Sequence, residues 1–410
     1  MLERVGIERI AAGGDGVGRL ADGRVVFVPR TAPGDVVTLK DLRPSRRFAR
    51  ARLDRVLEPG PERIEPRCSH YTTDSCGGCQ LQHLTTRAQL TARRSVVGDA
   101  LRRLGRLDVS DPEIEPAEQQ FGYRAKLTLA VSPDARRIGL HPLGPGQDVF
   151  ELARCHITAD SLMELWSVLR GLKQLLAPGL DRLVLRLDRS GGRHVVAQVA
   201  GSVVWTRAAE LAVELGRRKQ PATLWWHPEG GAARVVAGPR GSAGPPASVF
   251  EQVHPAMGDR VRRFAVSRLG PVAGQRVWDL YAGIGETTAL LVEAGAQVES
   301  VERDARAVAH AASTGVSALR HAGLAETIVP RLGQADVVVT NPPRNGMDPI
   351  VSAAVAASAA RRVVYVSCDP ATLARDIAAL APRFALAEVR TFDMFPQTAH
   401  VETVAVLDRV

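Results

Sequence analysis

The fold prediction starts from the stretch RRVVYVSCDP, residues 361–370, in which an apolar run ends at one cysteine in a turn. Residues 363–366 predict a strand and residues 371–376 predict a helix, so Cys368 should lie at the carboxyl end of the strand. Ligands bind at that edge in an open α/β sheet. The dipole of the following helix should favour the thiolate of Cys368. A single cysteine is more often a small buried apolar residue, so a catalytic role depends on the surrounding motifs.

A second strand signal, residues 275–280, leads into a turn that contains Tyr281 and Gly283. A third strand signal ends in Glu302, about twenty residues later. A glycine turn lets the backbone approach a ligand, and an acid at this spacing binds ribose hydroxyls, so the pair predicts a nucleotide site. The dinucleotide fingerprint fails because Thr288 stands at its last glycine position. The turn is similar instead to motif I of S-adenosylmethionine (SAM) methyltransferases.

Two further strand signals should reach the same edge of the sheet. Residues 336–340 end in Asn341-Pro342-Pro343-Arg344, whose prolines predict a stiff loop facing the substrate. The segment 400–407 puts Glu402 on a closing strand, although a surface glutamate would give the same pattern. Residues 246–410 are therefore expected to form a Rossmann-like α/β domain.

Composition narrows the class of protein. The 410 residues are 45% hydrophobic, which suits two to four packed domains. No apolar run is long enough to span a membrane and no signal peptide is apparent, so a soluble, cytoplasmic protein is expected. The net charge is +9, and residues 1–110 hold 20 Lys and Arg against 13 Asp and Glu. A GC-rich gene would explain the high arginine content but not its clustering, so an anionic partner is expected there.

Residues 1–58 predict a small β-barrel, because short alternating runs are separated by glycine turns. The barrel resembles the TRAM domain, an oligonucleotide-binding-like fold found on RNA-modifying enzymes. Its arginines coincide with an aromatic residue, Phe48, which favours RNA contact over a merely solvated face. These arginines are Arg43, Arg46, Arg47, Arg50, Arg52 and Arg55.

Four of the five cysteines form one pattern, Cys68-x7-Cys76-x2-Cys79 with a distant Cys155. Disulfides are not expected in a cytoplasmic chain. Four thiolates can hold a [4Fe–4S] cluster or a zinc ion, and spacing alone does not choose between them. The surrounding region, residues 59–245, is expected to be an α+β domain with this metal-cluster loop. Its segment around Tyr123, Arg124 and Lys126 combines aromatic and basic side chains suited to RNA.

Taken together, the chain resembles the RNA (uracil-5-)-methyltransferase family, in the branch with a TRAM domain and an iron–sulfur cluster. Bacterial 23S ribosomal RNA uracil-5-methyltransferases typify that branch. The resemblance covers almost the whole length and includes Phe250-Glu251-Gln252-Val253, the glycine turn, Asn-Pro-Pro-Arg, Val-Ser-Cys-Asp-Pro and His-Val-Glu-Thr-Val. It implies a class I SAM-dependent enzyme with domains at 1–58, 59–245 and 246–410, and a monomer is expected. It also favours a [4Fe–4S] cluster over zinc and 23S rRNA over tRNA.

The resemblance also implies roles for residues. Uracil C5 is a weak nucleophile, so the Cys368 thiolate would first add at C6, and Glu402 would later remove the C5 proton. The target base would have to leave its stack to be reached. The implied SAM residues are Gln252, Tyr281, Gly283, Glu302 and Asn341, and the implied RNA residues are Tyr123, Arg124, Lys126 and Arg344, with Asn341 also facing the base.

The chain departs from the family pattern at three places. Asn341 replaces an aspartate, and Glu251 stands where a second phenylalanine is common. The segment 323–336 is short and lacks the aspartate expected to contact adenine. Alternatives therefore stay open: an RNA-binding protein without activity, a cytosine-5 methyltransferase, a zinc-dependent RNA-binding module, or a tRNA uridine methyltransferase.

Overall fold

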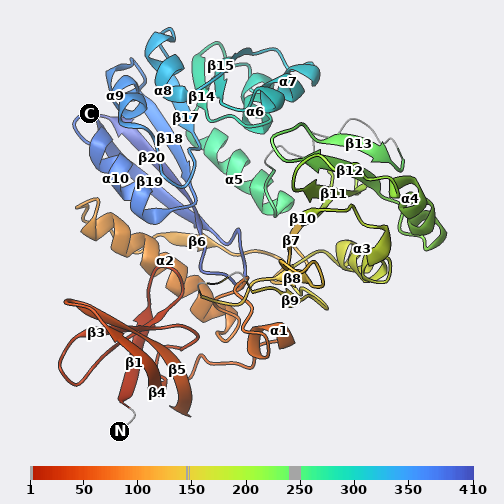
Figure 1. Cartoon of the computed structure of the whole chain (residues 1–410). Coiled ribbons are helices and arrows are strands. Elements are labelled where there is room, and N and C mark those ends of the chain that lie inside the picture. The colour runs from red at the N-terminus through yellow and green to blue at the C-terminus, as the bar shows by residue number, and fades with distance from the viewer. Residues whose placement is uncertain (1–2, 145, 147, 240–250) are drawn as a thin grey trace. The chain divides into compact units, whose positions relative to one another are not determined.

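The computed structural model describes residues 3–144, 146, 148–239 and 251–410 (Figure 1). The chain divides into two compact units. The first unit contains residues 1–65, 80–118 and 256–410, and the second contains residues 66–79 and 119–255. The expected boundary at 245/246 and Phe250 lie outside the described residues.

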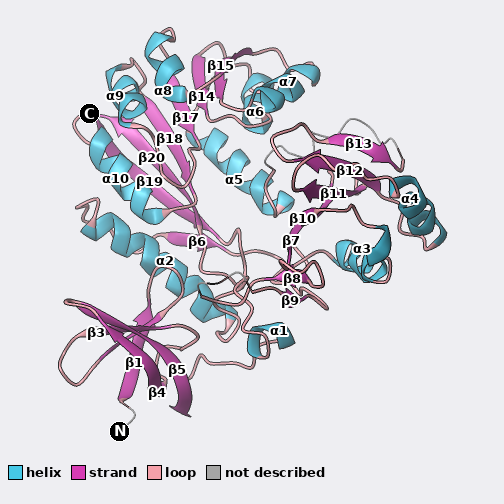
Figure 2. Cartoon of the chain, viewed as in Figure 1, coloured by secondary structure: helices cyan, strands magenta, loops and turns pink. Residues whose placement is uncertain are grey.

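The N-terminal segment forms the expected barrel, closed by five strands in the order β1-β2-β3-β5-β4 (Figure 2). Alternate side chains of these strands, such as Val5, Val26 and Val37, fill its interior. Gly18 is required where β2 pairs with β1, because a Cβ there would lie 2.4 Å from a methyl carbon of Val5. The strands are β1 (Arg4–Ile10), β2 (Gly16–Arg19), β3 (Val25–Val28), β4 (Val36–Pro44) and β5 (Phe48–Glu58).

The rest of the first unit is built on an eight-stranded sheet with the order β16-β15-β14-β17-β18-β20-β19-β6. The strands from β16 to β18 are parallel, and β20 runs antiparallel to both β18 and β19. The strands are β6 (Glu113–Glu115), β14 (Arg276–Leu280), β15 (Gln297–Glu302), β16 (Leu319–Ala322), β17 (Val337–Thr340), β18 (Arg362–Ser367), β19 (Phe384–Phe392) and β20 (Glu402–Arg409).

Helices cover both faces of this sheet. One core contains Val97 of α2, Val351 of α9 and Leu373 of α10, and another contains Val261 of α5 and Leu291 of α6. The chain order reverses at β14, which has β15 on one side and β17 on the other, so a ligand crevice is expected where these strands end. The helices are α2 (Thr86–Arg103), α5 (Pro255–Arg268), α6 (Glu286–Glu293), α7 (Ala305–Ser313), α8 (Ala325–Ile328), α9 (Pro349–Ala357) and α10 (Pro370–Leu380), with a 3₁₀ turn at Val329–Arg331.

The second unit is a seven-stranded sheet with the order β13-β12-β11-β10-β7-β8-β9. Its core includes Trp166 of α3, Leu211 of α4 and Leu183 of β10. The strands are β7 (Lys126–Val131), β8 (Ile138–Leu140), β9 (Phe150–Glu151), β10 (Leu180–Leu187), β11 (Arg193–Val199), β12 (Thr223–Pro228) and β13 (Arg234–Ala237). The helices are α1 (Ser69–Thr72), α3 (Asp160–Arg170) and α4 (Ala208–Arg217), with a 3₁₀ turn at Lys173–Leu175. None of the described helices has the length and apolar character needed to cross a bilayer.

Candidate active site

The predicted strand ends meet at one edge of the large sheet. Cys368 directly follows β18, and Glu402 opens the antiparallel neighbour β20. Ser367 of β18 lies opposite Thr403 of β20, so Cys368 and Glu402 adjoin this pair on neighbouring strands. The structure thus brings together the thiol and the carboxyl group expected to act in sequence.

The thiol of Cys368 is half-buried. Burial raises its pKa, the charge of Glu402 raises it further, and the guanidinium of Arg344 opposes both. The net shift of this pKa is thus upward, opposite to the direction expected from α10 alone. The carboxylate of Asp369 caps α10 and accepts hydrogen bonds from the N–H groups of Ala371 and Thr372, at 3.0 and 2.9 Å. Its negative charge adds to the rise in the pKa of Cys368.

Glu402 is only 2% exposed, so it is not a surface glutamate. One of its carboxyl oxygens, Oε2, is buried without a hydrogen-bond partner among the described residues. Burial raises the pKa of Glu402 to about 7, and the charge of Arg344 partly opposes that rise. A group with this pKa can exchange a proton near neutral pH, as a general base must.

Arg344 and Asn341 lie in the loop after β17. Both are exposed. The backbone N–H of Asn341 donates to the carbonyl of Leu280, 3.1 Å away, so the loop starts beside the end of β14. Arg344 lowers the pKa of both Cys368 and Glu402, which places its charge near both groups.

The glycine turn after β14 is held against Glu302. The N–H of Gly283 donates to Oε2 of Glu302 at 2.9 Å, and the N–H of Asp304 donates to Oε1 at 2.8 Å. Gly283 has a φ of +57°, and Tyr281 adopts a φ of +62°. A tyrosine in this left-handed region is strained, which is typical of functional sites. Burial raises the pKa of Tyr281 to about 12, so its hydroxyl stays neutral.

Asp279 also belongs to this site and was not predicted from the sequence. Asp279 is 2% exposed, and its carboxylate accepts a hydrogen bond of 2.6 Å from the hydroxyl of Thr288. Burial raises the pKa of Asp279 to about 7. Thr288, which breaks the dinucleotide fingerprint, thus ties α6 to β14. An aspartate inside an apolar strand was the available signal.

Within the second unit, the four predicted metal ligands belong to two apolar clusters, both of which contact Cys155. Cys68 and Cys79 share a buried cluster with Tyr123, and Cys155 packs against both this cluster and the core that contains Cys76. All four are free of disulfides. Across the described part of the chain, no three His, Cys, Asp or Glu side chains form a metal-binding group. The donor set nevertheless suits a thiolate-bound metal, because all four side chains are free cysteines in apolar surroundings and Gly78 approaches Cys76, whose sulfur accepts its N–H at 3.4 Å.

The predicted RNA residues of the second unit have different surroundings. Tyr123 is 5% exposed, and its ring stacks on His254 with 4.9 Å between ring centroids. Arg124 precedes β7, and its N–H donates to the carbonyl of Ile157 at 2.9 Å. Tyr123 is thus covered by the second unit itself.

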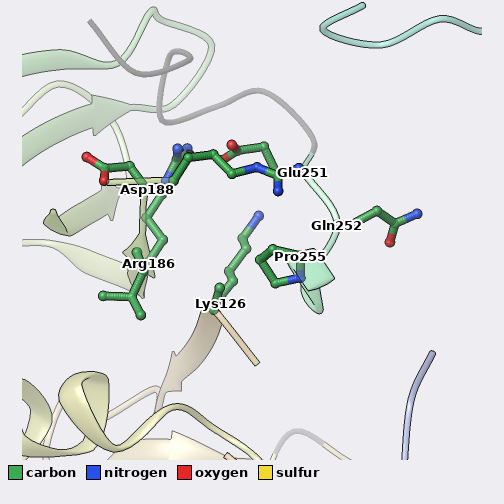
Figure 3. Close-up of a pocket in the computed structure, with 9 residues that line it drawn as sticks. Lys126, Arg186, Asp188, Glu251, Gln252 and Pro255 are labelled. Carbon is green, nitrogen blue, oxygen red and sulfur yellow. Dashed lines mark ion pairs between the residues drawn. The ribbon is translucent and has the colours of Figure 1, made fainter. Parts of the chain in front are cut away.

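Lys126 and Gln252 line a pocket with Arg186 and Glu251, whose volume is about 440 Å³ with its open mouth included (Figure 3). Arg186 forms a 2.5 Å ion pair with Glu251. Burial lowers the pKa of Lys126, and the charge of Arg186 lowers it further. Figure 3 shows the amide of Gln252 directed away from the other labelled residues.

Comparisons with known proteins agree with this site. Residues 3–53 match the TRAM domain, and residues 279–410 match the tRNA (Uracil-5-)-methyltransferase family. A 23S rRNA (uracil(1939)-C(5))-methyltransferase RlmD of Chromohalobacter salexigens is 33% identical over 98% of this chain and 88% of its own. The chain belongs to the RNA (uracil-5-)-methyltransferase family. The predicted family and enzyme class are confirmed: this is a SAM-dependent enzyme that methylates uracil C5 in RNA.

Other relatives support the same family. An uncharacterised RNA methyltransferase of Thermosynechococcus vestitus is 32% identical over 98% of this chain and 96% of its own. A tRNA (uracil-54, C5)-methyltransferase of Pyrococcus abyssi, solved with S-adenosyl-L-homocysteine, covers 98% of this chain and 99% of its own with a TM-score of 0.74. At 21% identity, that likeness shows the methyltransferase fold alone.

Proposed function

We propose that this enzyme methylates C5 of a uridine in 23S rRNA through a covalent bond between Cys368 and C6 of the base. The observation that carries the proposal is the pairing of Cys368 with the buried, partner-less oxygen of Glu402 at one sheet edge. Neither group would be needed there by a protein that only binds RNA. A buried carboxyl group without a hydrogen bond is unfavourable, so a use in the reaction accounts for it.

The reaction proceeds in balanced steps. The Sγ of Cys368, as thiolate, adds to C6, and the C5–C6 π electrons move toward C5 and O4 as an enolate. SAM, when bound, supplies the methyl group that C5 then attacks. The carboxylate of Glu402 takes the C5 proton, the C5–C6 double bond forms again, and Sγ leaves C6. Burial raises the pKa of Cys368, and the positive charge of Arg344 is proposed to stabilise the thiolate against this effect.

The residues at the ends of β14, β15 and β17 are proposed to hold SAM. Glu302 would accept from the ribose hydroxyls beside Gly283, and Tyr281, Asn341 and Gln252 would bind the remaining polar groups. Glu326, whose charge acts on Tyr281, is proposed to replace the missing adenine aspartate.

We propose that Cys68, Cys76, Cys79 and Cys155 bind a [4Fe–4S] cluster, with zinc as the alternative. The presence of four free thiols in two apolar clusters that both contact Cys155 supports a metal of either kind. Metal analysis of the purified protein separates them. Four irons per chain with a brown chromophore would support the cluster, and one zinc per chain without colour would support zinc. A protein that contains neither metal would contradict both assignments.

The RNA is proposed to contact the arginines of the barrel and Arg344, with Arg124 and Lys126 of the second unit. Tyr123 is buried against His254, so no RNA contact is proposed for it. 23S rRNA is preferred because relatives that match nearly the full chain carry that activity in their names. tRNA is the second candidate, because the family description and the solved Pyrococcus abyssi enzyme name it. The enzyme is proposed to act as a cytoplasmic monomer.

Tritium release from RNA labelled at uracil C5 tests the function. Wild type with SAM should release tritium from 23S rRNA, whereas Cys368→Ala should release none and Glu402→Gln should release it far more slowly. Release from tRNA but not from 23S rRNA would move the substrate to tRNA. Absence of release from both RNAs, with folded and metal-loaded protein, would contradict the proposed reaction.

A further inference from the structure

A buried carboxylate in α10 collects hydrogen bonds from three segments around the site. Asp376 is 2% exposed. Its Oδ2 accepts from the Tyr365 hydroxyl of β18 at 2.6 Å and from the backbone N–H of Met347 at 2.7 Å. Its Oδ1 accepts from Nε and a terminal nitrogen of Arg375, at 2.8 and 2.7 Å. Asp376 therefore joins the strand and helix on either side of Cys368 to the loop after β17.

Arg375 extends the connection along that loop. Its guanidinium donates to the carbonyl of Asn345 at 2.8 Å and to that of Met347 at 3.4 Å. Gly346, between them, has a φ of +78°, and a Cβ there would lie 2.3 Å from Arg375 and 2.5 Å from Asp376. Only glycine lets the loop come this close to α10.

We propose that Asp376 is a positioning residue, which holds the loop carrying Arg344 at a fixed place beside Cys368. The contacts fix the chain at Asn345 and Met347, within three residues of Arg344. Arg344 itself is exposed, so the loop backbone determines where its charge lies. The inference rests on the proposed role of Cys368 and adds to it the group that sets the environment of the thiol.

The charge of Arg344 gives this role a measurable effect. The groups acting on the Cys368 thiol are Glu402 from β20, Asp369 at the start of α10, and Arg344, of which Arg344 alone lowers its pKa through its charge. If the loop shifts, that effect weakens and the pKa of Cys368 rises. Removing the negative charge of Asp376 would by itself lower the pKa of Cys368. A direct effect of that charge therefore predicts a lower pKa of Cys368, whereas a shift of the loop that carries Arg344 predicts a higher one.

The Asp376→Asn substitution tests the proposal. Both oxygens of Asp376 accept from donors, so either orientation of an asparagine amide sets its NH2 group against a donor. The rate of iodoacetamide alkylation of Cys368 would be followed against pH by mass spectrometry of its peptide, in the full chain without RNA or SAM. Arg344→Gln should give the full upward shift in the pH midpoint of Cys368 alkylation, and Asp376→Asn should give part of that shift. Asp408→Asn is the matched control, because it breaks the ion pair with Arg362 at the opposite ends of β18 and β20.

Turnover supplies a second readout. Asp376→Asn should lower kcat for RNA methylation about tenfold to a hundredfold, as expected for a misplaced group, with SAM affinity within about twofold of wild type. An unchanged or lowered thiol midpoint in folded Asp376→Asn would overturn the proposal. If Asp376→Asn does not fold, Arg375→Gln is tested in its place, because Arg375 is exposed. A raised midpoint of Cys368 alkylation would then support the proposal, and an unchanged or lowered midpoint would overturn it. A wild type that titrates as expected but never methylates uridine would instead contradict the proposed function.

Discussion

A carboxyl group as buried as that of Glu402 holds its proton more tightly than one in water, because burial penalises the charged form. The pKa of about 7 has a direct kinetic consequence, since only the carboxylate can accept the C5 proton. We expect kcat/KM to rise with pH most steeply below about 7, where Glu402 loses its proton, and to go on rising above it as the Cys368 thiolate fraction grows. Initial rates at saturating SAM between pH 5.5 and 8.5 check this. A rate that is flat across that range would contradict the role of Glu402 as base.

The same residue should make the fold less stable as pH rises. The folded-state pKa lies above the ordinary 4.5, so the folded chain retains a proton that the unfolded chain loses between pH 4.5 and about 7. Glu402→Gln should therefore raise stability at pH 8, by up to about 3 kcal/mol, and have little effect near pH 4.5. Melting temperatures at pH 5 and pH 8 measure it. The exposed Glu293→Gln is the control and should show no such pH-dependent gain.

At the scale of elements, the start of α10 controls the thiol. Asp369 caps the helix and adds a negative charge that raises the pKa of Cys368. Asp369→Asn keeps a good cap and removes the charge. We predict faster iodoacetamide alkylation of Cys368 at pH 7.5 and an almost unchanged melting temperature. Slower alkylation in the folded variant would contradict this electrostatic account.

The strand ends themselves could be predicted from sequence, because apolar β-branched runs stop at identifiable polar residues. Glu302, Asn341 and Cys368 all follow or end parallel strands as expected. The effect of α10 on Cys368 could not be predicted, because it depends on which way the Asp369 side chain turns. The hydrogen bonds of Asp376 could not be predicted either, because its partners come from a strand, a loop and its own helix.

At the scale of the molecule, long-range contacts limited the prediction. No local pattern indicated that β6 would pair with β19, or that α2 would supply Val97 to the core of the large sheet. Arg93 of α2 and Asp393 form a buried ion pair of 3.1 Å across 300 residues of sequence. By contrast, the barrel was predictable because its strands are consecutive and its glycine turns are local.

The barrel leads to a prediction about RNA affinity. Arg46 and Arg47 are exposed on it. Contacts to phosphates release counterions, so replacing both with glutamine should weaken RNA binding and reduce the slope of log affinity against log salt by about 2. Filter binding from 50 to 300 mM salt checks this, with Arg217→Gln on α4 as the control. An unchanged slope would mean that these arginines do not contact the RNA.

The most direct test of the covalent mechanism is to trap the enzyme on RNA that contains 5-fluorouridine. Fluorine at C5 cannot leave as a proton, so the bond between Cys368 and C6 should persist after methyl transfer. We predict a complex that survives denaturing electrophoresis, requires SAM, and yields a peptide modified at Cys368. Cys368→Ala should give none. A wild type that methylates uridine yet forms no such complex, or forms it through another residue, would contradict the account.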